Sequence, residues 1–373
     1  MSDRKPLQVD PPIALLAELS HRCPLRCGYC SNPLELTRTS AELGTDDWCR
    51  TLQEAAELGV LQVHFSGGEP SVRQDLEQLV SHARRHDLYT NLITSGVLLD
   101  ARRIDDLYEA GLDHLQLSVQ GRDAQGADLI GGYPGGHEKK LAVAALVRER
   151  GIMLTLNAVV HRRNLHEVDA LIDLAMELDA HRIEIACVQY SGWARRNLAA
   201  LLPTPEQVED LMKTIEAARA RVLGHIAIDF VPPDYYAERP KPCMHGWGQQ
   251  IITVNPAGLV LPCHSAETIP GMVFDSVTHR SLADIWYRGE AFGRFRGTDW
   301  MQEPCRSCEF REQDFGGCRC QALAISGDVN AADPVCEKSP DRAKVNALIA
   351  AAQAEPDAPY LYRGESIGVN RSG

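Results

Sequence analysis

Between residue 13 and about residue 190, short apolar runs alternate with longer segments whose apolar residues recur at helical spacing. The short runs, each the length of one strand, lie at 13–19, 61–66, 89–94, 114–119, 152–160 and 182–188. The helical segments lie at 45–59, 72–86, 101–111, 138–151 and 165–179. This alternation predicts an α/β fold with a parallel sheet and helices outside it. Six units are too few for a closed eight-stranded barrel, so we expect an open, partial (β/α)6 barrel with its chemistry at the C-terminal ends of the strands.

The pattern changes beyond residue 232. A helix near 204–222 and a strand at 225–231 end the periodic part, and Pro, Gly and Cys then become frequent. A region of about 100 residues with few apolar positions usually needs bound metal for its stability. We therefore expect an N-terminal tail at 1–11, a barrel domain at 12–232, a cysteine-rich domain at 233–345 and a C-terminal tail at 346–373. The last part of that tail, residues 355–373, is expected to be loosely held.

Composition narrows the class of protein. The chain has 373 residues, of which 44% are hydrophobic and 24% charged, as in ordinary globular proteins. No apolar run reaches about 18 residues and the first residues lack an apolar export segment, so the sequence predicts neither a membrane span nor secretion. The formal charge of −13 removes the basic field that favours nucleic-acid binding. We expect a cytoplasmic protein.

Twelve cysteines are unusual for that compartment, where disulfides are rare and clustered thiols more often bind metal. Ten of them form two groups, one at residues 23–30 and one at residues 243–336. The other two, Cys49 in a helical segment and Cys187 at the end of an apolar run, are expected to be small buried hydrophobic residues.

The first group, Cys23, Cys27 and Cys30, has the spacing C-x3-C-x2-C and follows the first predicted strand. Three thiolates can hold a [4Fe–4S] cluster by three of its irons and leave the fourth iron open to an amine and a carboxylate. The alternative is a zinc site completed by His21 or His64, because zinc also accepts three cysteines and one histidine.

This spacing, with Tyr29 before the last cysteine, resembles the motif of radical S-adenosylmethionine (SAM) enzymes. The resemblance implies that the open iron binds the amino and carboxylate groups of SAM and that the reduced cluster cleaves SAM to a 5′-deoxyadenosyl radical. It implies further that the sequence Gly67-Gly68-Glu69 after the second strand holds the SAM amino group. Four polar residues at the ends of the third and fourth strands would face the SAM carboxylate and ribose, or else merely cap loops: Thr94, Ser95, Ser118 and Gln120.

The second cysteine group resembles the SPASM extension of the same family, which carries two auxiliary iron–sulfur clusters. With this extension, the resemblance covers residues 12 to about 340. It implies one cluster on Cys243, Cys263, Cys318 and Cys320 and a second on Cys305, Cys308, Asp314 and Cys336. The two would be [4Fe–4S] clusters, or one of them a [2Fe–2S] cluster. Asp314 stands where the family pattern has a cysteine, and a carboxylate ligand should change the reduction potential of its cluster. The alternatives are a pair of structural zinc sites and, for Asp314, a turn cap before Phe-Gly-Gly.

SPASM proteins mostly modify peptides, so the resemblance implies a peptide-modifying oxidoreductase. The run from Gln189 to Asn197 and the segment HRCPLRCGYCSNPLEL resemble the branch that cyclises the precursor peptide of pyrroloquinoline quinone (PQQ). Ser191 stands where that branch would have a second Tyr. In this branch a Glu γ-carbon is joined to a Tyr ring, and Tyr190 and His245 are candidates for the base that removes the ring proton.

That branch implies three partners: the PQQ precursor peptide, a small peptide chaperone and an electron donor such as flavodoxin. Two other functions stay open on the sequence. One is a different SPASM enzyme, which forms thioether links or oxidises a side chain. The other is a zinc-binding interaction protein without enzymatic activity.

Overall fold

The computed structural model describes residues 9–355 and 357–365 of the chain. Its centre is a sheet of nine strands in the order β7-β6-β5-β4-β3-β2-β1-β8-β9. All neighbouring strands are parallel except β8 and β9. The strands are β1 (Ala14–Ser20), β2 (Gln62–Gly67), β3 (Tyr89–Thr94), β4 (His114–Val119), β5 (Met153–Val160), β6 (Arg182–Cys187), β7 (Ala227–Val231), β8 (Ile251–Val254) and β9 (Val260–Leu261). The predicted open, parallel-stranded barrel is confirmed.

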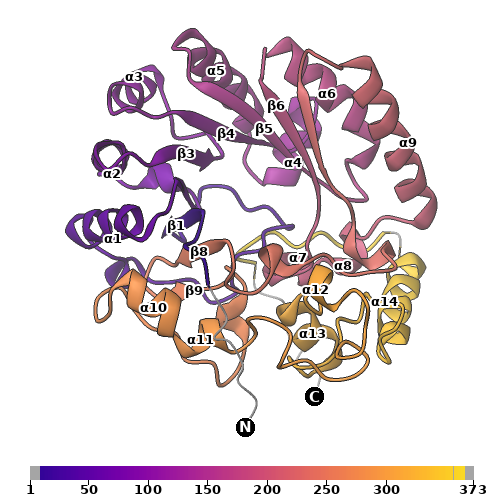
Figure 1. The fold of residues 1–373 in the computed structure, drawn as a ribbon. Helices are drawn as coiled ribbons and strands as arrows, with labels where there is room; N and C mark the ends of the chain where they lie inside the picture. The colour runs from indigo at the N-terminus through magenta and orange to yellow at the C-terminus, as the bar shows by residue number, and fades with distance from the viewer. Residues whose placement is uncertain (1–8, 356, 366–373) are drawn as a thin grey trace, which may run out of the picture.

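Helices cover the outer face of the curved sheet, as Figure 1 shows for α1, α2, α3, α5, α6 and α9. Their bounds are α1 (Thr45–Leu58), α2 (Leu76–Arg85), α3 (Ala101–Glu109), α5 (Gly136–Glu149), α6 (Val168–Glu177) and α9 (Pro205–Arg221). Local chemistry sets their ends: the Asp100 side chain caps α3, and Thr204 and Gln207 form a capping box on α9. Between sheet and helices lies the main core, whose strand residues Leu15, Val63 and Leu115 are fully buried.

Three short helices lie on the connections: α4 (Ala124–Gly131), α7 (Gly192–Arg196) and α8 (Leu198–Leu201). The hydrophobic pattern did not predict α4, because its eight residues include Gly126 and Gly131 and give little helical periodicity. No helix in the described part of the chain is long and apolar enough to cross a membrane.

After β7 the chain returns to the opposite edge of the sheet, where β8 pairs in parallel with β1. Short elements follow: α10 (Leu282–Arg288), α11 (Glu290–Gly293), α12 (Arg311–Asp314), α13 (Arg319–Ser326) and α14 (Arg342–Ala354). Of these, α10 and α11 contribute Ile285, Trp286 and Phe292 to the main core. A small separate core contains Phe295, which makes edge-to-face contacts with Trp247 and Trp300. This region therefore has the thin core that its composition predicts.

The expectation of a loosely held C-terminus is wrong as far as residue 365. Residues 342–354 form α14, and residues 357–365 lie back on the cysteine loop that follows β1. Two hydrogen bonds anchor residues 357–365 to backbone groups more than 300 residues earlier: the Tyr360 hydroxyl accepts the N–H of Gly28, and the Arg363 guanidinium donates to the carbonyl of Cys23. A polar segment without periodicity shows none of this in its sequence, because its partners come close only in the folded chain. Residues 366–373, which belong to the same expectation, lie outside the described residues.

Candidate active site and cluster sites

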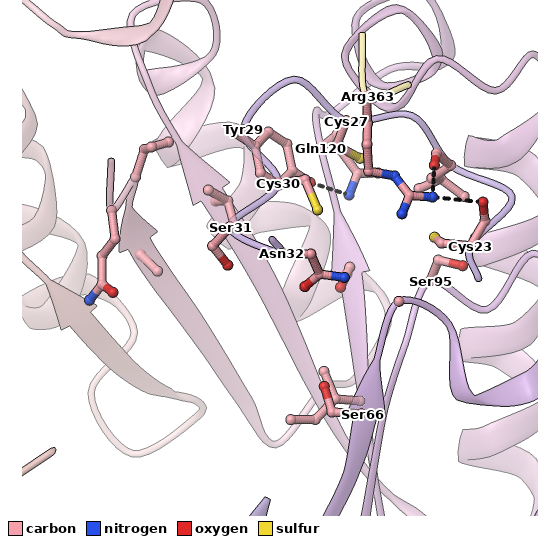
Figure 2. Close-up of a pocket in the computed structure, with 18 of the residues that line it drawn as sticks. Cys23, Cys27, Tyr29, Cys30, Ser31, Asn32, Ser66, Ser95, Gln120 and Arg363 are labelled. Carbon is pink, nitrogen blue, oxygen red and sulfur yellow. Dashed lines mark hydrogen bonds between the residues drawn. The ribbon is translucent and has the colours of Figure 1, made fainter. Parts of the chain in front are cut away.

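The C-terminal ends of the strands surround a cavity of about 350 Å³. Cys23, Cys27 and Cys30 all line it, from the loop between β1 and α1. Figure 2 shows these thiols together with Ser66, Ser95, Gln120 and Arg363, which line the same cavity from four other parts of the chain. The cavity is also lined by Tyr29, Gly67, Gly68, Thr94 and Ser118. Of the residues that the sequence assigned to SAM and its cluster, Glu69 is the one that the described lining does not include.

Gly67 and Gly68 are needed because the cysteine loop passes directly against them. A Cβ on Gly68 would lie 2.6 Å from the carbonyl oxygen of His21 and 2.5 Å from that of Arg22, closer than real Cβ contacts. Gly67 has a φ of +119°, which L side chains rarely adopt. The two glycines therefore allow β2 to end against the backbone that leads into the first cysteine.

Glu69 ties the end of β2 to the end of β3. One carboxylate oxygen accepts hydrogen bonds from the backbone N–H of Ser71 (3.0 Å) and the hydroxyls of Ser71 and Thr94 (2.5 and 2.6 Å). The other accepts from the backbone N–H and the hydroxyl of Ser95 (2.7 and 2.5 Å). The side chain is fully buried. This carboxylate thus connects the loops after β2 and β3. The contact with the SAM amino group that the motif implies stays a prediction.

A series of buried polar side chains, linked by hydrogen bonds, lies near Cys27. The Gln120 amide donates to the Tyr29 hydroxyl at 2.8 Å, a bond drawn in Figure 2, and its oxygen accepts from the ammonium of Lys140. Burial raises the pKa of Tyr29 well above its ordinary value, so the phenol stays protonated. Burial also lowers the pKa of Lys140. The sequence offered no pattern that would place Lys140 here, since it lies on a helix far along the chain.

The three thiols of this cavity suit a metal cluster. Burial raises the pKa of Cys23 to about 12 and that of Cys30 to about 11, and it also raises the pKa of Cys27. Thiols in such surroundings deprotonate when a metal binds them, because the metal supplies the compensating positive charge. Three soft donors beside an open space of this size therefore fit an iron–sulfur cluster with one free iron. Neither His21 nor His64, the candidate fourth ligands of a zinc site, is among the described residues that line this cavity.

A second cavity of about 650 Å³ adjoins the first, and Ser31, Gln189 and His264 line both. Four cysteines line the second cavity together: Cys243, Cys263, Cys318 and Cys320. The first of them begins a tight turn in which Met244 and His245 have positive φ angles of 48° and 60°. Tyr190 also lines this cavity, whereas His245 is exposed and is absent from the described lining.

A third, much smaller pocket is lined by Cys305, Cys308, Asp314 and Cys336 together, which is the set assigned to the second auxiliary cluster. The Lys338 ammonium lies 3.8 Å from the sulfur of Cys308. One oxygen of Asp314 accepts the backbone N–H of Gly316 at 2.9 Å, so Asp314 caps a turn as well as lining the pocket. Within the described residues, no three or more His, Cys, Asp or Glu side chains are arranged to hold a single metal ion.

Asp333, which the sequence analysis missed, lines both the second cavity and this small pocket. Its carboxylate accepts the backbone N–H of Cys318 at 2.7 Å and the side-chain amide of Gln321 at 2.9 Å. Burial raises the pKa of Asp333 to about 6. The two cysteines outside the groups are placed differently: Cys49 packs against the main core, and Cys187 is buried at the wall of the first cavity.

Two family models match the chain. Residues 17–175 match the radical SAM superfamily, and residues 243–309 match SPASM, described as an iron-sulfur cluster-binding domain. Among solved structures, Streptococcus suis SuiB bound to S-adenosylmethionine has a TM-score of 0.73 at 20% identity, covering 87% of this chain and 77% of that one. A structure of anSMEcpe with bound AdoMet has a TM-score of 0.65 at 17% identity, covering 93% and 98%. At these identities the likeness shows the fold.

Sequence relatives are much more similar. A PqqA peptide cyclase from Rhodopseudomonas palustris is 57% identical over 358 residues, which is 96% of this chain and 95% of the relative. One from Ruegeria pomeroyi is 56% identical over the same length, covering 96% of each protein. At such identity over nearly the full length, the chain belongs to the PqqA peptide cyclase family of radical SAM proteins with a SPASM domain.

Proposed function

We propose that this protein is a radical SAM peptide cyclase of PQQ biosynthesis, which joins the γ-carbon of a Glu to a ring carbon of a Tyr within one precursor peptide. The observation that carries the proposal is the junction of the two larger cavities, because Ser31, Gln189 and His264 line both. A peptide side chain at this junction would lie between the first cysteine group and the second. Family membership supports the same substrate class.

The cofactor assignments form part of the proposal. Cys23, Cys27 and Cys30 would hold a [4Fe–4S] cluster that, when bound with SAM and reduced, supplies a 5′-deoxyadenosyl radical. Gly67, Gly68, Thr94, Ser95 and Ser118 would contact SAM from the cavity wall, since all five line it. Tyr29 and Gln120 line it too and hold each other in place. Glu69 would act as a positioning residue, since it holds the loops that carry Thr94 and Ser95.

The auxiliary ligand sets are those that share a pocket. One comprises Cys243, Cys263, Cys318 and Cys320, and the other comprises Cys305, Cys308, Asp314 and Cys336. Asp333 lies between them and fixes the backbone of Cys318. The chain would comprise a barrel at 12–232 and an auxiliary-cluster domain at 233–345. Strands β8 and β9 of the second segment extend the barrel sheet.

Bond formation requires three changes in the peptide. A hydrogen atom would pass from the Glu γ-carbon to the 5′-deoxyadenosyl radical that cleaved SAM supplies, and the resulting carbon radical would add to the Tyr ring ortho to the hydroxyl. The ring would then lose one proton to a base and one electron to an auxiliary cluster, which recovers its aromaticity. The protein must therefore hold both side chains at van der Waals distance and exclude water. Arg195, which lines the second cavity and donates to the Tyr235 hydroxyl at 3.0 Å, offers a positive charge to the substrate carboxylate. Tyr190 lines the same cavity and stays protonated, because burial raises its pKa well above the ordinary value.

The proposed partners are the precursor peptide, a small peptide chaperone that presents it, and a flavodoxin-like electron donor, and the reaction would take place in the cytoplasm. In the solved structures, SuiB has been observed bound to its precursor peptide SuiA, so this fold accommodates a peptide in at least one protein.

The test is an anaerobic assay with reconstituted protein, SAM, a reductant and a precursor peptide containing Glu and Tyr, with the chaperone added. The product should be lighter by two hydrogen atoms, with fragments joined between Glu and Tyr. A peptide with Phe in place of Tyr is the matched control for the phenol. A Cys23→Ala, Cys27→Ala, Cys30→Ala variant should lose about four irons and all 5′-deoxyadenosine formation.

Three results would overturn the proposal. A thioether link or a singly oxidised side chain in the peptide would indicate a different SPASM enzyme. Zinc without iron and acid-labile sulfide in the purified protein would indicate a structural metal protein. Cleavage of SAM by the triple cysteine variant would show that the cluster assignment is wrong.

A further inference from the structure

The segment 357–365, here called the C-terminal strap, crosses the mouth of the barrel and lies on the cysteine loop. In Figure 1 it is the yellow segment that runs from the end of α14 toward the mouth of the barrel. The Tyr360 hydroxyl accepts the backbone N–H of Gly28 at 2.7 Å and donates to the carbonyl of Ile130 at 3.0 Å. Gly28 has no room for a Cβ, which would lie 2.6 Å from the Tyr360 ring. The strap and the loop are therefore fitted to each other.

Asn197, which follows α7, hydrogen-bonds to both the strap and the cysteine loop. Its side-chain amide donates to the carbonyl of Gly28 at 2.9 Å and to that of Leu361 at 2.8 Å, and its oxygen accepts the backbone N–H of Leu361 at 2.7 Å. Asn197 is buried. One side chain thus satisfies backbone groups of both the strap and the cysteine loop, which fixes their relative position.

Arg363 makes the closest connection between the strap and the cavity. Its guanidinium donates to the carbonyls of His21 (3.3 Å), Cys23 (2.8 Å) and Leu25 (3.0 Å), the residues around the first cysteine. Its backbone N–H donates to the carbonyl of Arg26 at 2.9 Å. The side chain is buried, and Figure 2 shows it over the cavity next to Cys23 and Cys27. Three carbonyls bound by one rigid fork give the loop a defined shape.

Arg363 also brings a positive charge to the wall of the first cavity. Among the described residues that line the first cavity, it is the one Arg or Lys. The groups that the cavity is proposed to hold, three thiolates with their cluster and the carboxylate of SAM, are anionic. A buried guanidinium next to them is a preorganised counter-charge in a region with little water to screen it.

We propose that the C-terminal strap is a functional part of the SAM site, in which Arg363 is a positioning residue that shapes the cysteine loop and supplies a positive charge facing the cluster and SAM. This inference rests on the proposed function only in the placement of the cluster and SAM in the first cavity. It does not depend on which peptide is modified.

The test compares four variants of the full-length reconstituted protein. Arg363→Met removes the charge and the fork, Arg363→Lys keeps the charge without the fork, and Tyr360→Phe removes the hydrogen bond to Gly28. Arg162→Met is the matched control, because Arg162 also donates to three carbonyls, those of Ala199, Leu202 and Ala352, and is absent from the described lining of the cavity. The readouts are SAM binding by equilibrium dialysis, the reduction potential of the SAM-binding cluster by redox-titrated electron paramagnetic resonance, and the rate of iron loss to a chelator.

Arg363→Met should weaken SAM binding by at least about tenfold, because it removes a positive charge from a poorly screened site that would hold the SAM carboxylate. It should lower the reduction potential, since the reduced cluster loses a nearby positive charge, and it should speed iron loss. Arg363→Lys should keep the potential close to that of the wild type but lose iron faster, because an ammonium cannot bind all three carbonyls. Tyr360→Phe should speed iron loss without changing the potential.

The proposal is overturned if Arg363→Met binds SAM as the wild type does with an unchanged potential, or if Arg162→Met shows the same losses. Should Arg363→Met fail to hold any cluster, Arg363→Lys decides: iron loss at the wild-type rate would refute the positioning role. None of these readouts needs the peptide. A failed crosslinking assay together with these losses would count against the proposed substrate alone.

Discussion

The carboxylate of Glu69 offers the sharpest test of how the SAM cavity is built. Glu69→Gln keeps the size of the side chain but replaces one oxygen with an amide NH2. The hydroxyls of Ser71, Thr94 and Ser95 can rotate to accept from this group, but the backbone N–H groups of Ser71 and Ser95 cannot. One of these buried N–H groups therefore loses its acceptor, which costs about 2–3 kcal/mol. The loop that carries this N–H group, after β2 for Ser71 or after β3 for Ser95, should then open about 30 to 150 times more often.

Hydrogen exchange followed by mass spectrometry measures this opening directly in SAM-free protein. The peptide that contains Ser95 or the one that contains Ser71 should exchange faster in Glu69→Gln by about that factor. Glu184→Gln is the matched control, because Glu184 lines the same cavity and accepts a side-chain bond from Gln116 at 3.0 Å. Unchanged protection at both serines in Glu69→Gln would refute the reasoning and leave the carboxylate free to bind the SAM amino group directly.

The other predictions concern single residues. Gly68→Ala should push the cysteine loop away from β2 and reduce the iron held by the first cysteine group. Gly293→Ala, where a Cβ meets nothing within 4 Å, should keep the wild-type iron content, and full iron in both variants would contradict the prediction. Asp314→Cys should keep the second auxiliary cluster with a changed reduction potential, whereas Asp314→Asn, which can cap the turn equally well, should lose its spectrum; an Asn variant with the wild-type spectrum would show that Asp314 only caps the turn. Burial lowers the pKa of His161 to about 3. Between pH 7.5 and 5.5 this histidine therefore takes up a proton in the unfolded chain but not in the folded one. Over that range the wild type should lose about 1.4 kcal/mol more folding stability than His161→Gln. Denaturation curves at the two pH values, with equal losses in both proteins, would contradict it.

Much of the barrel could be predicted from the sequence. The six apolar runs between residues 13 and 188 correspond to β1–β6, and the five helical segments correspond to α1, α2, α3, α5 and α6. Local physics decides these elements, because periodicity and capping act between residues that are close in the chain. β8 could not be predicted in the same way. Its four residues form an apolar run that fits several structures, and only pairing with β1 makes it a strand of the barrel sheet.

The sequence motifs identified the family and grouped the ligands, and the structure places each predicted group along one cavity or pocket. The motifs did not predict in which direction individual side chains point. Glu69 belongs to a motif associated with SAM, yet its carboxylate faces Ser71, Thr94 and Ser95 of the protein. Its orientation depends on where the ends of β2 and β3 meet, which no spacing within the motif specifies.

The sequence by itself determined the fold class, through the alternation of strand-length and helix-length segments, and the family, through its cysteine motifs. The resemblance to that family then implied the three sets of candidate ligands. Tertiary structure alone decided which distant residues complete the sites. It brought His264 to the junction of two cavities, placed Asp333 between the auxiliary ligand sets and laid Arg363 on a loop some 340 residues earlier. The physical reason is that these contacts are made by single polar groups on irregular backbone. Such contacts have no periodicity, and they form only when the packed sheet and helices bring their partners within hydrogen-bonding distance.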